Sequence, residues 1–373
     1  MILLQKIHNK LISEKIFYFT FLPASFFLFV VAFLLLLYPQ SAVSGVKEGI
    51  STCLEAVVPS LFPFLVVSGI ACDFGVFDYL SAKTKKIMSF LFALPSVAFP
   101  IITMSMLGGF PVGATLIEKA YDSGRLSRSQ AQRMLMFCVN PGPAFVVMAI
   151  GYTVLGSEKA GWLIYSAVTV SSLIIGILSR FLAEKDEFCY CSCKKQSYKS
   201  MSDVLTETIN NSTKNMMNIC VWVIIFSCLG KLIEMLPINN GTLYFLKMIS
   251  EVTNGAITAS EHFNLPVIAA VISFSGLCVH FQIMPCLIKV GLKYKYFLSV
   301  RILSSALSCG FALLFTELFP QYSQVVSIGT KPHIASLQTS PFVCVCLMVM
   351  CGLFVIGEDY IFNKKSLKFN QKD

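Results

Sequence analysis

Charged side chains are scarce in this chain, because Asp, Glu, Lys and Arg together make up only 13% of its 373 residues. Combined with 55% hydrophobic residues and a mean hydropathy of +0.73, so few charges exclude a soluble globular protein. The net charge of +9 lies in loops and termini rather than in the apolar runs. The composition predicts an all-α, polytopic integral membrane protein whose basic loops face the anionic inner leaflet of a lipid bilayer, so no nucleic-acid partner is implied.

The sequence also lacks the patterns of an enzyme or a metalloprotein. We find no metal-ligating quartet, nucleophile–base pair or phosphate-binding loop, so no catalytic residue, metal or cofactor is predicted. Most of the fourteen cysteines lie in apolar runs, where cysteine acts as a small hydrophobic residue, and no disulfide framework follows. Cys189, Cys191 and Cys193 share a charged loop, but without a fourth ligand they match zinc-site spacings poorly and favour free thiols.

Apolar runs alternate with charged segments, and this alternation divides the chain into five parts. The first apolar run, 16–38, exceeds the hydrophobic region of a signal peptide and has no small-residue cleavage site. We therefore expect a retained first helix, and lysines near both ends of the chain predict cytoplasmic termini. The parts are an N-terminal tail with the first transmembrane helix (1–45), a first repeat (46–182), a charged cytoplasmic loop (183–202), a second repeat (203–316), and a C-terminal transmembrane helix with a basic tail (317–373).

One apolar run is interrupted by Gly108, Gly109, Pro111 and Gly113. In a helix each such glycine costs roughly 1 kcal/mol relative to alanine, and the proline about 3 kcal/mol. Broken backbone at membrane depth persists only where it is buried in protein or lines a watery cavity, and in transporters it marks the substrate site. We therefore predict substrate binding at these four residues. A kinked helix packed closely on a neighbour is the alternative.

A second interruption, formed by Asn140, Pro141, Gly142 and Pro143, divides another apolar run. Two prolines and a glycine free several carbonyl groups, and the Asn140 amide both donates and accepts hydrogen bonds. The second half-helix would begin with free N–H groups and a positive dipole end, which suit an anion. We predict that Asn140, Pro141 and Gly142 contribute to the same site, with a proline kink sealed by neighbouring helices as the alternative.

Later apolar runs contain isolated polar side chains. His280 and Gln282 lie within 265–290 and are predicted to bind substrate, because a histidine desolvated in a membrane needs a partner or a ligand. A purely structural hydrogen-bonding role for His280 is the alternative. Glu251 and Asn254 interrupt another apolar stretch, and a carboxylate there needs a counter-group or a proton. These two residues therefore suggest coupling to a proton or an ion.

A polar stripe at helical spacing opens each of the two long parts of the chain. Glu207 and Asn211 lie 159 positions after Glu48 and Thr52. Acidic groups so close to membrane depth are costly unless they face protein or water, so Glu48, Glu207 and Asn211 join the predicted coupling network. The alternative is an interfacial helix with its charges in solvent.

A second correspondence relates the helix breaks themselves. Gly276 lies 167 positions after Gly109, and Gly291 lies 167 positions after Gly124. The order and spacing of these matches favour an internal duplication over chance. Repeats that present broken or re-entrant helices at matching places are how many secondary transporters build a site near the bilayer midplane. Basic residues follow both breaks, so the distribution of charge does not decide whether the repeats are inverted.

Five motifs in order resemble the YlbJ-like sporulation integral membrane proteins. They are LGGFPVGA (107–114), SGRLS (123–127), QAQRMLMFCVNPGPAF (130–145), EVTNG (251–255) and SFSGLCVHFQ (273–282), within a resemblance that covers about residues 40–310. Members of this family carry paired Gate, or nucleoside-recognition, domains similar to segments of concentrative nucleoside transporters. Phe110 replaces an expected tyrosine, and Asn140-Pro141 replaces an Asn-Ser-like pair, so the substrate preference of this chain stays open.

The resemblance implies a sporulation transporter in the bacterial cell membrane, specifically the outer forespore membrane. Its implied solute is dipicolinic acid, a small aromatic anion passing from the mother cell toward the forespore. The expected partners are this solute, the bilayer and, from the position of Glu251, a coupling proton or ion, while assembly into a homo-oligomer stays open. A nucleoside or nucleobase carrier and a non-transporting scaffold for spore-envelope assembly are the alternatives, and an enzyme is not expected.

Overall fold

The computed structural model describes residues 25–26, 28–73, 76–183 and 201–320, and every regular element in these ranges is helical. The predicted all-α class is confirmed. The three clustered cysteines and most of the parts at the two ends of the chain lie outside the described residues. The elements are α2 (Pro39–Thr52), η1 (Cys53–Val57), α3 (Val58–Asp73), α4 (Val76–Phe92), α5 (Ala98–Gly108), α6 (Phe110–Asp122), α7 (Arg128–Phe137), η2 (Ala144–Val154), α8 (Glu158–Leu178), η3 (Ser179–Leu182), α9 (Met201–Glu234), α10 (Asn240–Ser250), α11 (Val252–His262), α12 (Leu265–Phe274), α13 (Gly276–Val290) and α14 (Tyr294–Leu318).

Within the described ranges, four helical segments are long and apolar enough to cross a membrane. A fifth candidate is a pair of helices, Leu28–Leu37 and Pro39–Glu55, that is bent by 104° where Pro39 opens α2. The four are Glu158–Leu182, Leu205–Glu234, Leu265–Val290 and Tyr294–Leu318. This set confirms a polytopic membrane protein.

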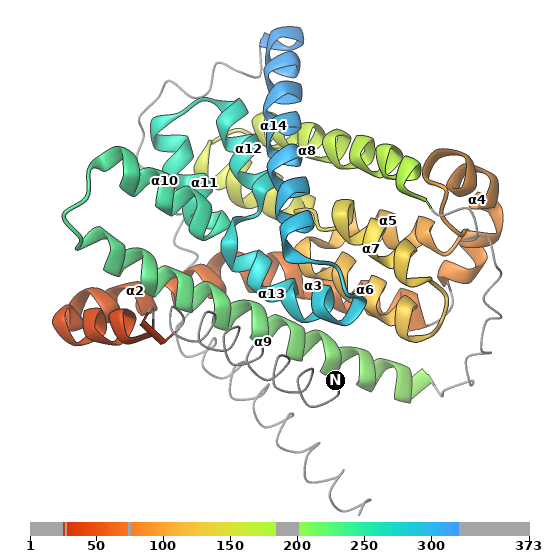
Figure 1. Ribbon diagram of the computed structural model, residues 1–373, viewed down its shortest axis with the longest axis horizontal. Helices are drawn as coiled ribbons and strands as arrows, with labels where there is room; N and C mark the ends of the chain where they lie inside the picture. Colours follow the sequence, from red (N-terminus) through yellow and green to blue (C-terminus); the bar gives the residue numbers. More distant parts are fainter. Residues whose placement is uncertain (1–24, 27, 74–75, 184–200, 321–373) are drawn as a thin grey trace, which may run out of the picture.

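The longest helix, α9, lies along one side of the molecule with α2 beside its C-terminal end (Figure 1). The two run antiparallel: a Cβ added at Gly45 would lie 2.7 Å from the Cys228 Cα, and one at Gly49 would lie 2.7 Å from the Ile224 Cα. Further along, α3 meets the start of α9, where Gly69 faces Thr208. Small residues allow this close approach, and the resulting packing holds the helices together. In lipid, burial of apolar surface alone does not drive helices to associate.

The apolar run before the first glycine break is two helices rather than one. Helix α4 ends at Phe92, Ala93 adopts a positive φ of 48°, and α5 begins at Ala98. After the break, Ser127 caps the N-terminus of α7. The Ser127 hydroxyl oxygen accepts from the Gln130 N–H at 3.1 Å, and the Gln130 side-chain oxygen accepts from the Ser127 N–H at 2.9 Å.

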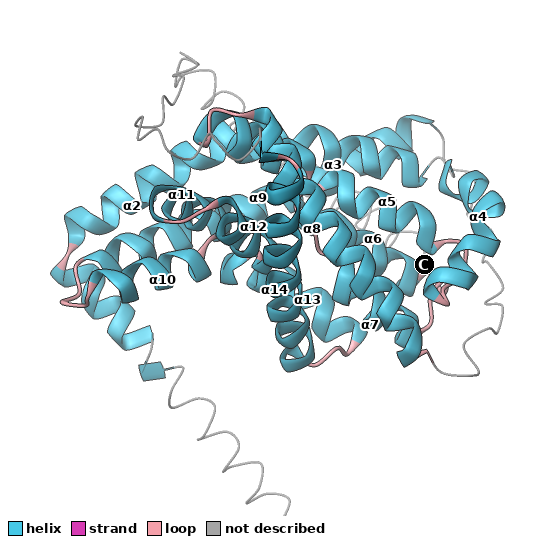
Figure 2. Cartoon of the chain, turned by 90° about the horizontal axis from the view of Figure 1, so that it is seen from above, coloured by secondary structure: helices cyan, strands magenta, loops and turns pink. Residues whose placement is uncertain are grey.

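Helices α8, α12 and α14 pack against one another through the middle of the molecule (Figure 2). Their facing side chains, with those of α7, form the deepest part of the apolar core, where Phe137, Ile164, Ile268 and Phe297 are fully buried. Helix α8 precedes the loop between the predicted repeats, whereas α12 and α14 follow it. The two parts of the chain therefore share one core.

Candidate functional site

The first break is a single residue, Gly109, between α5 and α6. Its φ of 90° lies in a region that residues with a Cβ rarely adopt, so the break needs glycine. Pro111 then occupies the first turn of α6, where its missing N–H costs nothing. Gly113 follows against the end of α7, where an added Cβ would overlap the Cys138 carbonyl oxygen. Gly108 is buried at the end of α5.

The second break, between α7 and η2, packs directly on the first. A Cβ at Gly142 would lie 3.1 Å from the Gly109 nitrogen and 3.0 Å from the Leu107 carbonyl oxygen. The N-terminal ends of α6 and η2 therefore lie side by side, and no side chain caps either one. The structure brings together the two glycine and proline breaks that the sequence singled out in the first repeat.

Asn140, beside this junction, is almost fully buried and already engaged. Its amide nitrogen donates to the Phe137 carbonyl at 2.7 Å, and its amide oxygen accepts from the Ser172 hydroxyl at 2.6 Å. Pro141 follows it and is also buried. The Asn140 side chain holds the end of α7 to α8, so what remains open at this break is backbone.

The part of the chain predicted to be the second repeat contains a comparable junction. Ser275 and Gly276, both with positive φ, separate α12 from α13, and a Cβ at Gly276 would lie 2.8 Å from the Val252 nitrogen at the start of α11. Here a side chain fills the junction: the Glu251 carboxylate accepts from the Thr253 N–H at 2.9 Å and the Asn254 N–H at 2.7 Å. Glu251 is 2% exposed, so a buried protein carboxylate caps α11 beside the start of α13.

Glycines that lie 167 positions apart in the sequence have similar backbone conformations. Gly109 and Gly276 both have positive φ at a break, and Gly124 and Gly291 both have positive φ at the turn that follows. Matching conformations at matching offsets support the interpretation that the two parts are repeats.

Arg301 of α14 forms hydrogen bonds with residues at both sets of breaks. It is 1% exposed, and its guanidinium donates to the Val139 carbonyl at 2.6 Å and the Met136 carbonyl at 3.1 Å, at the end of α7. It also donates to the Ser273 carbonyl and the Ser275 hydroxyl, both at 3.4 Å, at the end of α12. Carbonyls at helix C-termini carry the negative ends of the helix dipoles, so they stabilise a buried cation.

Arg301 was not predicted from the sequence, where it is one of several basic residues that follow the second break. Its position well inside an apolar run, seven residues into α14, is the feature that could have identified it. Arg133 of α7 has a similar setting. It is 2% exposed and donates to the carbonyls of Phe92, Ala93 and Ser179, at the ends of α4 and α8.

His280 lies in α13 next to the second break, with both ring nitrogens engaged. Nε2 lies 3.0 Å from the Phe274 carbonyl oxygen, which can only accept, so Nε2 carries the proton. Nδ1 therefore accepts from the Tyr294 hydroxyl at 3.1 Å. The Gln282 amide donates to the Cys278 sulfur at 3.3 Å within the same helix. In this conformation His280 holds the end of α12 to the start of α14.

The predicted coupling residues do not form one network. The Lys231 ammonium forms ion pairs with Glu48 at 3.1 Å and with Glu234 at 3.4 Å. Glu234 also forms an ion pair with Lys247 at 2.5 Å. This partly exposed cluster joins α2, α9 and α10 at one end of the molecule.

Of the other four predicted coupling residues, Glu251 and Asn254 adjoin each other at the start of α11, and Glu207 and Asn211 lie apart from them on α9. Asn254 donates to the Ser227 hydroxyl at 3.4 Å, and Glu207 is exposed on α9. Asn211, also on α9, lines a small cavity against α3 and α6. The polar stripe of α9 therefore has one exposed member, Glu207, and one that faces a cavity, Asn211.

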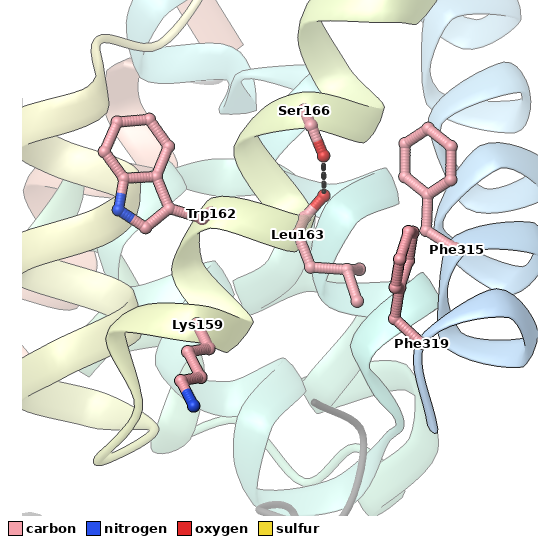
Figure 3. A pocket seen from close by; sticks show the side chains of 6 residues that line it. All are labelled: Lys159, Trp162, Leu163, Ser166, Phe315 and Phe319. Carbon is pink, nitrogen blue, oxygen red and sulfur yellow. Dashed lines mark hydrogen bonds between the residues drawn. The ribbon is translucent and has the colours of Figure 1, made fainter. Parts of the chain in front are cut away.

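A further cavity lies elsewhere, between α8 and the end of α14 (Figure 3). It measures about 450 Å³ and is lined by Lys159, Trp162, Leu163, Ser166, Phe315 and Phe319. Figure 3 shows the two phenylalanines across from Leu163 and Ser166, whose hydroxyl donates to the Leu163 carbonyl at 2.9 Å. None of the predicted site residues lines this cavity.

Apolar spans, paired helix breaks and buried arginines define a polytopic α-helical membrane protein with interrupted helices. The chain is 24% identical over 336 residues, which are 79% of its own length and 82% of the relative's, to the sporulation integral membrane protein YlbJ of Bacillus subtilis (strain 168). The resemblance inferred from the motifs is confirmed: the chain is similar to a YlbJ sporulation integral membrane protein over most of its length. No family model and no solved structure matches the chain.

Proposed function

We propose that this protein is a secondary carrier of a small anionic aromatic solute, with dipicolinic acid as the solute suggested by the family resemblance. The proposed location is the outer forespore membrane, and the proposed partners are the solute, the bilayer, a coupling proton or ion, and a second copy of the chain. The proposal assigns no enzymatic activity.

The observation that best supports a carrier is the contrast between the two junctions. In the second repeat, the N-termini of α11 and α13 adjoin, and that of α11 receives the carboxylate of Glu251. In the first repeat, the N-termini of α6 and η2 lie side by side at Gly109 and Gly142, and no side chain caps them. N–H groups and helix dipoles that accommodate a carboxylate in one repeat suit a solute carboxylate in the other.

In this mechanism the breaks stay rigid while the outer helices of the two repeats move around them. Arg301 fixes the C-terminal ends of α7 and α12, so both junctions keep their geometry when the outer helices shift. His280 donates to a solute only after it releases the Phe274 carbonyl, which makes its contribution dependent on conformation. Glu251 is the proposed coupling group, since leaving its N–H partners exposes a carboxylate that binds a proton or an ion.

The test is uptake of labelled dipicolinate into liposomes that contain the purified protein. Gly109→Leu forces a positive φ on a residue with a Cβ, and Gly142→Ala places a methyl group between the two helix ends. We expect at least tenfold lower uptake in both variants, and wild-type uptake in Gly230→Leu, where an added Cβ meets no atom within 4 Å. Wild-type uptake in both break variants contradicts the proposal, and competition by nucleosides would favour a nucleoside carrier.

A scaffold for spore-envelope assembly is the second candidate, and a specific observation favours it. The polar side chains beside the breaks, Asn140 and His280, already have partners inside the protein. A scaffold tolerates Gly142→Ala and His280→Phe as long as the protein folds, so spores would form with normal dipicolinate content. A carrier with these residues at its site would leave the spores depleted of dipicolinate.

A further inference from the structure

The small cavity lined by Asn211 lies where α3 and α6 of the first repeat meet α9 of the second. It measures about 30 Å³, and polar side chains line most of it: Thr115, Lys119, Thr208, Asn211, Ser212 and Asn215. Thr208 and Ser212 are almost fully buried, at 1% and 4% exposed. A polar hollow of this size suits one water-sized group or one carboxylate.

Lys119 gives this cavity its charge. Its neighbours in α6, Glu118 and Asp122, pair with Lys289 of α13 at 2.8 Å and 2.6 Å. No ion pair or hydrogen bond to the Lys119 side chain occurs within the part of the chain that the structure describes. The nearest acids in the sequence are thus already neutralised from another side, and the charge of Lys119 remains available.

We infer that this cavity is an anion subsite, in which Lys119 and the side-chain amides of Asn211 and Asn215 receive one carboxylate of the solute. An ammonium group with amide N–H donors favours an anion and repels a cation. Lys119 lies ten residues after Gly109, about 15 Å along a helix that rises 1.5 Å per residue. The cavity runs along α6 from Val112, next to the break, to Lys119, so Lys119 binds the solute away from the break. This inference rests on the proposed carrier function.

The position of the cavity between α6 and α9 gives it a role in moving the solute. A solute held between α6 and α9 touches both repeats at once, so relative movement of the repeats changes the donors around it. Lys119 moves with α6, whereas Asn211 and Asn215 move with α9. As the two helices separate, a solute carboxylate bound here would move toward the break or dissociate.

The experiment compares wild type with Lys119→Gln, Lys119→Arg and Lys214→Gln in liposome uptake of dipicolinate and of picolinate, which has one carboxylate. Lys214 is an exposed lysine of α9 outside the cavity and serves as the matched control. We expect Lys119→Gln to lower dipicolinate uptake about tenfold at subsaturating concentration, Lys119→Arg to restore it within about threefold, and Lys214→Gln to leave it unchanged. Equal uptake by wild type and Lys119→Gln overturns the subsite.

A second measurement separates this inference from the proposed function. Acetylation of lysines by a water-soluble reagent is followed by mass spectrometry with and without dipicolinate, malonate or inorganic phosphate. We expect dipicolinate and malonate to slow acetylation of Lys119 about fivefold and to leave Lys214 unaffected. Protection of Lys119 without dipicolinate uptake would reject the carrier and keep the anion subsite. Dipicolinate uptake that Lys119→Gln leaves intact, with no protection by any of the three anions, would reject the subsite alone.

Discussion

Buried polar side chains in this protein are held mainly by the ends of helices. Arg301 donates hydrogen bonds to carbonyl groups at the ends of α7 and α12, and Arg133 donates to those at the ends of α4 and α8. His280 donates to the last carbonyl group of α12. A membrane offers no water to those carbonyl groups, so a broken helix needs donors from the protein itself. Each of these residues therefore stabilises a break that would otherwise be costly.

Arg301→Met should destabilise the protein strongly, because it leaves four buried acceptors without their donor. We expect a loss of about 3 kcal/mol in the free energy of unfolding, read as a lower thermal unfolding midpoint in detergent. Arg180→Met, at an exposed arginine near the end of α8, is the matched control and should cost less than about 1 kcal/mol. An equal effect of the two substitutions would mean that Arg301 does not hold the breaks together.

Gly113→Ala should also destabilise the protein, since the new methyl group would overlap the Cys138 carbonyl oxygen and push α6 away from α7. Overpacking of this kind costs about 2 kcal/mol. Gly310→Ala in α14 provides the comparison, because an added Cβ there meets nothing within 4 Å and should stabilise the helix by about 0.5–1 kcal/mol. Thermal unfolding of both variants measures the difference, and a neutral Gly113→Ala would show that the two helices can separate freely.

At the level of elements, the interrupted helices occur as packed pairs. The break between α5 and α6 touches the break between α7 and η2, and the break between α12 and α13 touches the start of α11. Each pair places two half-helix N-termini together, and only the second pair contains a protein carboxylate. This difference between otherwise comparable junctions is the basis of the carrier proposal.

Glu251→Ala should weaken α11, because the first turn of that helix loses two hydrogen bonds to its N-terminal N–H groups. The expected cost is about 1–2 kcal/mol, measured as faster hydrogen exchange in α11 and a lower unfolding midpoint. Asn239→Ala removes the comparable but exposed cap of α10 and should cost less. If hydrogen exchange in α11 stayed at the wild-type rate, Glu251 would not act as its cap.

At the level of the whole molecule, the two parts of the chain are interlocked. Helices α2 and α3 lie along α9, α6 packs on α13, and α8 packs on both α12 and α14. The two parts therefore share one core. The contacts between α2 and α9 rely on glycines that leave no room for side chains.

The two parts should therefore assemble when they are expressed as separate chains, 1–190 and 191–373. We expect the second chain to copurify with the tagged first chain from detergent-solubilised membranes. Gly49→Leu, which would press a side chain onto the Ile224 backbone, should lower recovery at least fivefold, whereas Gly230→Leu should not. Undiminished recovery with Gly49→Leu would mean that the contact between α2 and α9 does not hold the parts together.

Much of the fold could be predicted because the membrane imposes simple rules on sequence. Apolar length predicted the spans, and Gly109 and the Asn140–Pro143 segment predicted the breaks, since helix-breaking residues act locally. The capping of α7 by Ser127 was equally local. The split of the run before Gly109 into α4 and α5 was not predicted, although Pro95 lies at that turn.

The sequence by itself determined the helical class, the membrane environment, the positions of the main breaks and the resemblance to YlbJ-like proteins, because each depends on composition or on short runs of residues. Only the tertiary structure decided which breaks touch, that Arg301 joins them, and that His280 and Asn140 already have partners. Those features depend on contacts between residues more than a hundred positions apart, such as Arg301 with Val139, which no local pattern encodes.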